Sequence, residues 1–68
     1  MLKQIKTFRY KGSHPTVDAL QEAFIIACEN DCIVRLQWIN FHTQYEIYID
    51  SSDTIQTMLK KLPEVYPV

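Results

Sequence analysis

The chain has 68 residues, 47% of them hydrophobic, and a formal net charge of −1. This length predicts one small domain, 1–68, whose core supplies only about 3–5 kcal/mol, so association with another chain would add stability. The near-neutral charge argues against a general binder of polyanions. No stretch approaches the roughly 20 apolar residues of a membrane span, and no signal peptide is visible. Two cysteines are too few for a disulfide framework. We therefore expect a cytoplasmic protein with reduced thiols.

Positive charge is concentrated at the N-terminal end of the chain. The first eleven residues contain no acid and four basic side chains, which are Lys3, Lys6, Arg9 and Lys11. The remainder has three basic residues against eight acidic ones, a net charge of −5. Lysines on an edge strand protect it from aggregation, whereas a basic strip can bind phosphate or an acidic partner. Both interpretations stay open at this point.

The first predicted element is a strand over Leu2–Tyr10, because Ile5, Thr7, Phe8 and Tyr10 favour extended backbone and no helix cap precedes them. Its alternation is imperfect, since Leu2, Phe8 and Tyr10 share one parity and Ile5 has the other. Either a bulge near Lys6-Thr7 shifts the phase or both faces of the strand are partly covered.

A helix is expected from Pro15 to about Glu29, because proline suits the first helical position. At 100° per residue its apolar side chains cover an arc of roughly 200°, which is wider than one sheet requires. The apolar residues of this arc are Val17, Ala19, Leu20, Ala23, Phe24, Ile26, Ala27 and Cys28.

The most regular pattern predicts a β-hairpin formed by Cys32–Phe41 and Gln44–Asp50. Apolar and polar residues alternate in both segments, so one face of the hairpin is expected to be buried. A turn centred on His42-Thr43 sets the register, and a one-residue slip would expose the apolar face. The predicted pairs are Trp38 with Ile47, Leu36 with Ile49 and, on the opposite face, Arg35 with Asp50.

A short second helix is predicted over about Thr54–Leu62, with N-cap candidates in the segment Ser51-Ser52-Asp53. Lys60 and Lys61 in its last turn complement the helix dipole, and Pro63 stops it. Its apolar face consists of Ile55, Met58, Leu59 and Leu62. In the extended tail that follows, Val65 and Tyr66 are expected to pack on the body.

The element order β-α-β-β-α predicts an α+β fold, a two-layer sandwich of one sheet and two helices. We expect a three-stranded, mainly antiparallel sheet with both helices on one face. The third strand is placed in the centre, antiparallel to both others. A right-handed crossover through the first helix would instead make the first two strands parallel and adjacent.

With both helices on one side, the other face of the sheet is expected to be uncovered. On the hairpin this face carries Arg35, Gln37, Ile39, Phe41, Gln44, Glu46, Tyr48 and Asp50. Scattered exposed apolar residues are normal in soluble proteins. Ile39, Phe41 and Tyr48 are nevertheless predicted to form a partner-binding group with Arg35 as their polar neighbour. The hypothesis is a small non-enzymatic interaction or regulatory module that forms a homodimer or binds another protein.

Binding of single-stranded nucleic acid through the basic first strand and the exposed sheet aromatics is the alternative hypothesis. Glu46 and Asp50 on the same face argue against it. The glycine–aromatic signature of RNA-recognition sheets is also missing.

Nothing in the sequence indicates a reaction centre or a metal site. Cys28, Cys32, His14 and His42 lack the spacing of a zinc site, and Cys28 falls on the predicted buried face of the first helix. No nucleophile–base arrangement, paired carboxylates or phosphate-binding glycine loop is recognisable. We therefore predict no enzymatic activity, catalytic residue, metal or cofactor, and no motif identifies a family.

Overall fold

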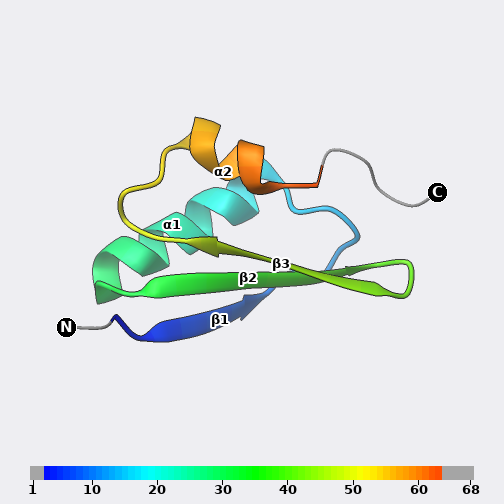
Figure 1. Ribbon diagram of the computed structural model, residues 1–68, viewed down its shortest axis with the longest axis horizontal. Coiled ribbons are helices and arrows are strands. Elements are labelled where there is room, and N and C mark those ends of the chain that lie inside the picture. The colour runs from blue at the N-terminus through cyan, green and yellow to red at the C-terminus, as the bar shows by residue number, and fades with distance from the viewer. Residues whose placement is uncertain (1–2, 64–68) are drawn as a thin grey trace.

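The computed structural model describes residues 3–63 and contains three strands and two helices (Figure 1). The α+β class and the order β-α-β-β-α are confirmed. Within the described residues, no helix is long and apolar enough to cross a membrane. The elements are β1 (Ile5–Arg9), α1 (Val17–Asn30), β2 (Ile33–Asn40), β3 (Thr43–Ile49) and α2 (Ile55–Lys61).

The sheet has the order β1-β2-β3 and is mixed. β1 is parallel to β2, and β2 is antiparallel to β3. The expectation of a central third strand is therefore wrong, and the crossover arrangement is the one observed. A parallel pair requires a connection of a dozen or more residues, which the 14-residue α1 supplies.

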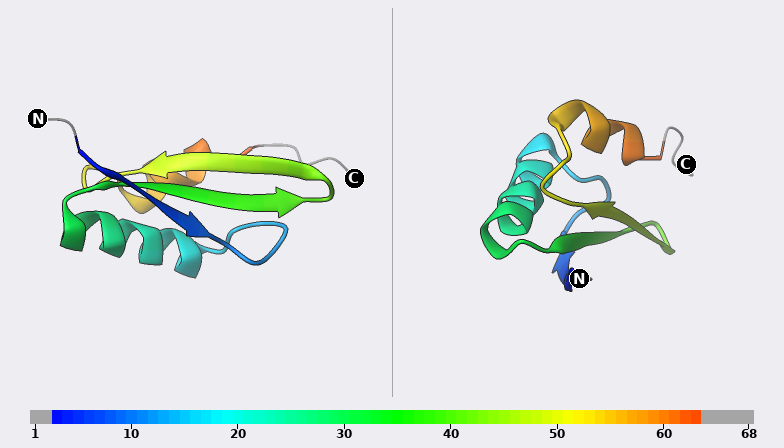
Figure 2. Two further views of the ribbon diagram at one scale, coloured as in Figure 1. Left: turned by 90° about the horizontal axis from the view of Figure 1, so that it is seen from below. Right: turned by 60° about the vertical axis from the view of Figure 1, so that its left-hand side comes forward.

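Both helices pack on one face of the sheet, as expected for two layers (Figures 1 and 2). Trp38, Leu36, Ile47 and Ile49 are buried as predicted. Trp38 is only 2% exposed, and its ring stacks on Tyr45 with centroids 5.8 Å apart. The core residues shared by helices and sheet are Leu20, Ala23, Ala27, Cys32, Val34, Leu36, Trp38, Ile47, Ile49 and Met58.

The hairpin register differs from the predicted one by two residues. The turn consists of Phe41 and His42, and the pair Asn40–Thr43 closes it. A shift of two residues leaves the side chains that remain in the strands on their predicted faces, because the side-chain period of a strand is two. Burial of one face therefore fixes the face of each residue, but it does not distinguish these two registers. The observed pairs are Trp38 with Tyr45, Leu36 with Ile47 and Arg35 with Tyr48.

Helix α1 begins two residues later than predicted. The hydroxyl of Thr16 is the N-cap and accepts a hydrogen bond from the backbone N–H of Ala19 at 3.2 Å. Pro15 is buried in front of the helix instead of occupying its first position. A side-chain oxygen at the cap satisfies a free helical N–H, which a proline cannot do.

The predicted burial of Cys28 is wrong, because this side chain is exposed. The buried stripe of α1 consists of Ala19, Leu20, Ala23 and Ala27 and is narrower than the apolar arc. Cys28 lies more than 100° of helix rotation from the middle of this stripe, and its thiol consequently points away from the sheet.

Helix α2 is capped by Thr54 and not by a residue of the segment 51–53. Thr54 and Thr57 bond each other's backbone N–H groups in a capping box. Met58 is buried, and Lys60 and Lys61 occupy the last turn as predicted. Val65 and Tyr66, which were predicted to pack on the body, lie outside the described residues.

Strand β1 is shorter than the predicted Leu2–Tyr10. It pairs with β2 without interruption from Ile5 to Arg9, which leaves no bulge near Lys6 within the strand. Its imperfect alternation has another cause. Phe8 packs against the core, whereas Ile5 lies on the opposite, uncovered face.

We predict that the turn residue Phe41 costs stability. Its φ is 55°, the left-handed region, where a side chain costs about 1–2 kcal/mol and glycine does not. Phe41→Gly should therefore unfold at a higher urea concentration than Phe41→Ala, by about 1 kcal/mol in free energy. The alanine variant is the matched control, because it also removes the ring but keeps the strain. A glycine variant less stable than the alanine variant would contradict this account.

Candidate functional site

The face of the sheet opposite the helices is uncovered in the described structure (Figure 2). The strand pairing arranges its side chains in rows that run across the sheet. The three rows are Thr7–Arg35–Tyr48, Arg9–Gln37–Glu46 and Ile39–Gln44. We call these residues, together with Ile5 and Ile33 at the other end of the sheet, the open face.

Hydrogen bonds between side chains hold the centre of the open face. Arg35 donates from Nη2 to Oγ1 of Thr7 at 2.9 Å. Glu46 accepts from the Tyr48 hydroxyl at 2.7 Å and from Nε2 of Gln37 at 3.3 Å. The bond from Tyr48, and then that from Gln37, lowers the pKa of Glu46 below its ordinary value. The centre of the face is therefore polar and carries a charged carboxylate on β3.

The four residues predicted to bind a partner do not form one group. Arg35 and Tyr48 are direct neighbours across the β2–β3 pair. Ile39 is 59% exposed on the same face but is separated from Tyr48 by the row that contains Gln37. Its apolar surface is therefore at one end of the sheet, with the polar row between it and Tyr48.

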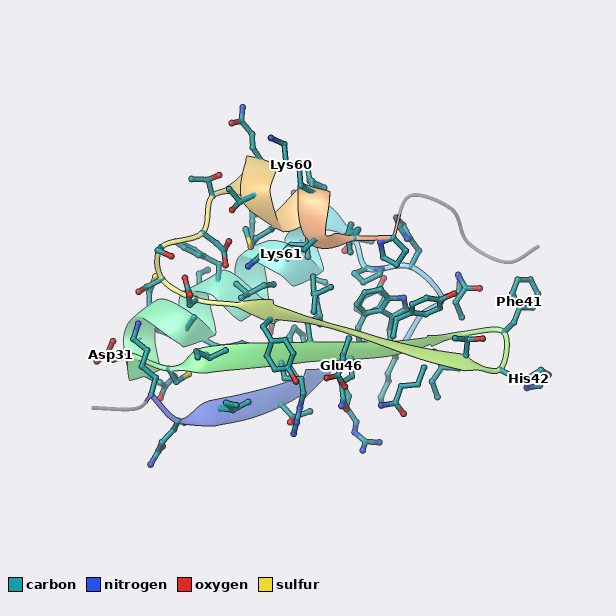
Figure 3. The ribbon with its side chains drawn as sticks, in the orientation of Figure 1. Asp31, Phe41, His42, Glu46, Lys60 and Lys61 are labelled. Carbon is teal, nitrogen blue, oxygen red and sulfur yellow. The ribbon has the colours of Figure 1, made fainter. Side chains whose placement is uncertain are left out.

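Phe41 lies in the turn and not on a strand of the open face. The alternation that placed it beside Ile39 ends at Asn40, and the positive φ of Phe41 redirects its side chain. In Figure 3 its ring projects from the hairpin tip, on the other side of the ribbon from Glu46. At 64% exposure, Phe41 could contact a partner only at the rim of the open face.

The contribution of β1 to the open face was largely missed by the sequence reasoning. Thr7 and Arg9 join the face because β1 pairs with β2 in parallel. The opposite parity of Ile5 and Phe8 was the available signal. This signal separates Ile5 from Phe8, but it could not align β1 with the rows of the hairpin.

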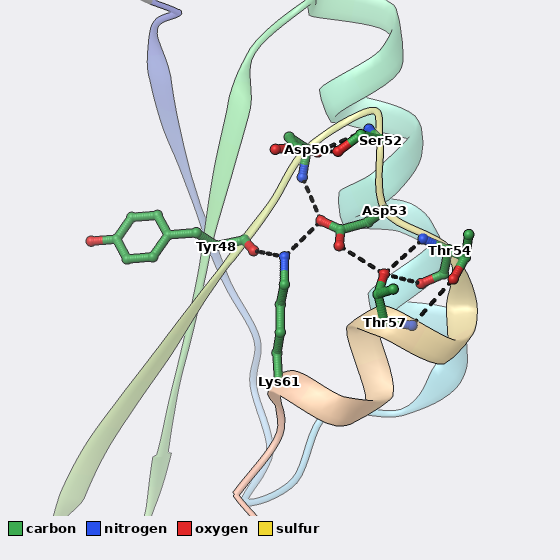
Figure 4. A network of polar contacts seen from close by, with 7 residues as sticks. All are labelled: Tyr48, Asp50, Ser52, Asp53, Thr54, Thr57 and Lys61. Atoms are coloured by element: carbon green, nitrogen blue, oxygen red, sulfur yellow. Dashed lines mark hydrogen bonds and ion pairs between the residues drawn. The ribbon is translucent and has the colours of Figure 1, made fainter.

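A second polar cluster joins the end of β3 to α2 (Figure 4). Lys61 donates from Nζ to the backbone oxygen of Tyr48 at 2.6 Å and to Asp53 at 2.7 Å. Burial raises the pKa of Asp53. The hydrogen bonds from Lys61, from the backbone of Asp50 and from Thr57 outweigh burial and hold this pKa below its ordinary value. The cluster therefore attaches α2 to the sheet.

Asp50 has a different partner from the one predicted. Its carboxylate accepts from the backbone N–H of Ser52 at 2.8 Å and also from the Ser52 hydroxyl. These bonds lower the pKa of Asp50. Arg35 bonds Thr7 instead, because the two-residue shift in register places Tyr48 opposite Arg35.

The residues considered for chemistry are dispersed. Cys28 and Cys32 are both free thiols, with Cys28 exposed and Cys32 buried. His14 and His42 lie outside the helices and strands, in separate loops. Within residues 3–63, no group of three or more His, Cys, Asp or Glu side chains is placed to hold a metal ion.

No family model, curated protein or solved structure matches the chain.

We predict that Asp53 makes stability depend on pH in the acid range. The native state holds its pKa below the ordinary value of 3.8, so the unfolded chain binds the proton more readily. The free energy of unfolding should fall as the pH decreases through this range, and Asp53→Asn should reduce the fall. Urea unfolding at pH 7, 4 and 3 measures the effect, with Glu22→Gln on the exposed face of α1 as the control. If the free energy of unfolding fell with pH equally in Asp53→Asn and in the wild type, the cluster would be ruled out as the cause of the pH dependence.

Proposed function

We propose that the chain is a non-enzymatic interaction module that forms a homodimer through the open face of its sheet. The observation that carries this proposal is the charge order along one row. Arg9 on β1 is positive, Gln37 on β2 is neutral and Glu46 on β3 is negative. The two charges stand two strand spacings apart, about 10 Å.

Such a row is complementary to itself. A second copy related by a two-fold axis that runs along β2, between the two sheets, would reverse the row. Arg9 of each copy would then face Glu46 of the other, and Gln37 would lie near its own counterpart. An interface of this kind is isologous, because the same patch serves both subunits. Two charge pairs would form in one dimer.

Apolar residues on the same face support association. The two-fold axis along β2 would bring Ile39 and Ile33 of each copy near their counterparts. Removing an isoleucine side chain from water contributes about 1.5–3 kcal/mol when burial is complete. Tyr48, which is 43% exposed, would be covered as well. Two of the four predicted contact residues, Ile39 and Tyr48, thus support the proposed interface, and Phe41 lies at its rim. Arg35 stands on β2, so it would lie near its own counterpart and the like charges would oppose association. Its bond to Thr7 draws each guanidinium toward β1 and away from the axis.

The edges of the sheet are less suited to self-association than its face. On the outer edge of β3, Lys61 bonds the backbone oxygen of Tyr48, which removes an acceptor that a new strand would need. β1 is the other edge strand. Its Lys6, which donates from Nζ to Oδ1 of Asn30 on α1 at 3.2 Å, carries a positive charge that repels a second copy of the same strand. Association through the face leaves both of these features undisturbed.

The proposed module would act in the cytoplasm, where the exposed thiol of Cys28 would stay reduced. A regulatory role would follow if self-association controls access to the open face. The open face is less suited to binding nucleic acid than to self-association. Of the aromatic side chains in the described sheet, Tyr48 lies on it, whereas Phe8 and Tyr45 pack against the core.

A charge exchange tests the proposed dimer. Arg9→Glu and Glu46→Lys should each weaken self-association at least 10-fold, because each places like charges in contact. The double variant should recover most of the loss, since it restores opposite charges with their positions exchanged. Sedimentation equilibrium at several protein concentrations measures the dissociation constant.

Lys60→Glu is the control, because it changes the charge by the same amount on α2, away from the open face. A wild-type chain that remains monomeric at millimolar concentration would refute the dimer. A double variant that dimerises no more tightly than the single variants would also refute it. Binding of a labelled oligonucleotide that weakens with salt would favour the nucleic-acid alternative.

A second prediction concerns the apolar part of the interface. Ile39→Ser should weaken the dimer about 10-fold while the monomer keeps its fold, because this side chain is exposed in the monomer. Ile25→Ser is the matched control, since Ile25 is exposed on α1. Circular dichroism checks the fold and sedimentation the association. Equal effects of both substitutions would show that general hydrophobicity, and not the open face, drives association.

A further inference from the structure

A pocket of about 370 Å³ opens where β1 ends beside β2. Arg9 is the last residue of β1 and pairs with Gln37, whereas β2 continues to Asn40. The final bond between the two segments runs from the N–H of Tyr10 to the backbone oxygen of Gln37, at 2.8 Å. Beyond it the chain leaves the sheet through Gly12, and the exposed edge of β2 forms one wall of the pocket.

The charged residues that line the pocket are Arg9 and Lys11, and both are positive. The ion pairs of the described residues join Lys3 to Asp31 and Lys61 to Asp53, so they involve neither cation. The carboxamides of Gln37 and Gln44 add polar groups to the lining, and the exposed side chain of Ile39 provides apolar surface. Trp38 also borders the pocket, but its side chain is 2% exposed and faces the helices.

The backbone of β2 contributes a further donor to the pocket. Ile33 donates its N–H to Gln4, and Gln37 accepts from Tyr10, so odd-numbered residues of β2 direct their backbone groups toward β1. Ile39 is the next residue of this series. Its N–H therefore points to the side that β1 has left, where Ile39 lines the pocket.

The segment that forms the outer wall is held in place by two contacts. Asn40 donates from Nδ2 to the backbone oxygen of Ser13 at 2.8 Å. Gly12 packs on the ring of Tyr10 so closely that a Cβ at this position would come within 2.5 Å of Cε2. The pocket is thus shaped before any ligand enters, which lowers the entropy cost of binding.

We infer that this pocket binds a small organic carboxylate. The acid group lies between Arg9 and Lys11 within reach of the Ile39 N–H, and the apolar body of the ligand packs on the exposed side chain of Ile39. The volume is at the lower end of the range of about 300–1,000 Å³ for ligand pockets, which selects a compact molecule. This inference does not depend on the proposed dimer.

Cyclohexanecarboxylate is the test ligand, and cyclohexylmethanol is its neutral counterpart of similar shape. Amide NMR shifts report occupancy at the residues that line the pocket. The carboxylate should shift these amides in a saturable manner, and the shifts should concentrate at residues 9–12 and 37–39. The alcohol and inorganic phosphate should each bind at least 10-fold more weakly. Equal binding of carboxylate and alcohol, or a lack of saturation, would overturn the inference.

Charge variants locate the acid group of the ligand. Arg9→Gln and Lys11→Gln should each weaken carboxylate binding at least 5-fold, whereas Lys60→Gln on α2 should change it less than 2-fold. Equal losses in all three would mean general electrostatic attraction and would overturn the site. The comparison with the alcohol needs no substitution, so it decides the question even if a variant does not fold.

Glu46→Gln separates this inference from the proposed function. It removes the negative charge that the dimer requires and leaves the lining of the pocket unchanged. Carboxylate binding by this variant at a concentration where it is monomeric supports the pocket whether or not the wild type dimerises. Loss of binding in the monomeric variant would overturn the pocket and leave the dimer unaffected.

Discussion

The central position of β2 determines which parts of this small molecule are closed and which remain open. Its even-numbered residues, among them Leu36 and Trp38, face the helices and form the middle of the core. Its odd-numbered residues, among them Gln37 and Ile39, stand on the open face, and their backbone groups point to β1. Because both neighbouring strands align to β2, it sets the rows of the open face and the place where the pocket begins. A change in the alternation of β2 would therefore disturb the core, the rows of the open face and the pocket together.

Much of the fold follows from periodicity in the sequence. The alternation in the hairpin is strong enough to assign the side chains within its two strands to their faces, and burial of Trp38 and Ile47 confirms that assignment. The register required more information than periodicity holds. A tight turn at Phe41 demands a positive φ, which usually selects glycine or asparagine, so nothing in the residue type indicated that the turn begins there.

The strand order and the candidate site were less predictable for a related reason. Short β1 has mostly polar residues at its exposed positions, so its sequence does not distinguish an edge beside β2 from an edge beside β3. Whether β1 pairs with β2 or with β3 depends on how α1 covers the sheet, which is a property of the whole chain. Without that alignment, the relation between Arg9 and Glu46 could not be recognised from their separation in sequence. For Cys28, the apolar arc of α1 was wider than the stripe that one sheet can cover, so composition alone overestimated burial.

Arg9 connects the two proposals, because it stands both on the open face and at the pocket. One guanidinium bound to a ligand carboxylate has fewer donors left for Glu46 of a second copy, and the ligand would occupy the space beside Ile39. Ligand binding and self-association would then oppose each other. The coupling is reciprocal, since a ligand that weakens the dimer by a given factor must bind the dimer more weakly by the same factor. A small metabolite could in this way control association through a single shared side chain, without any movement of the core.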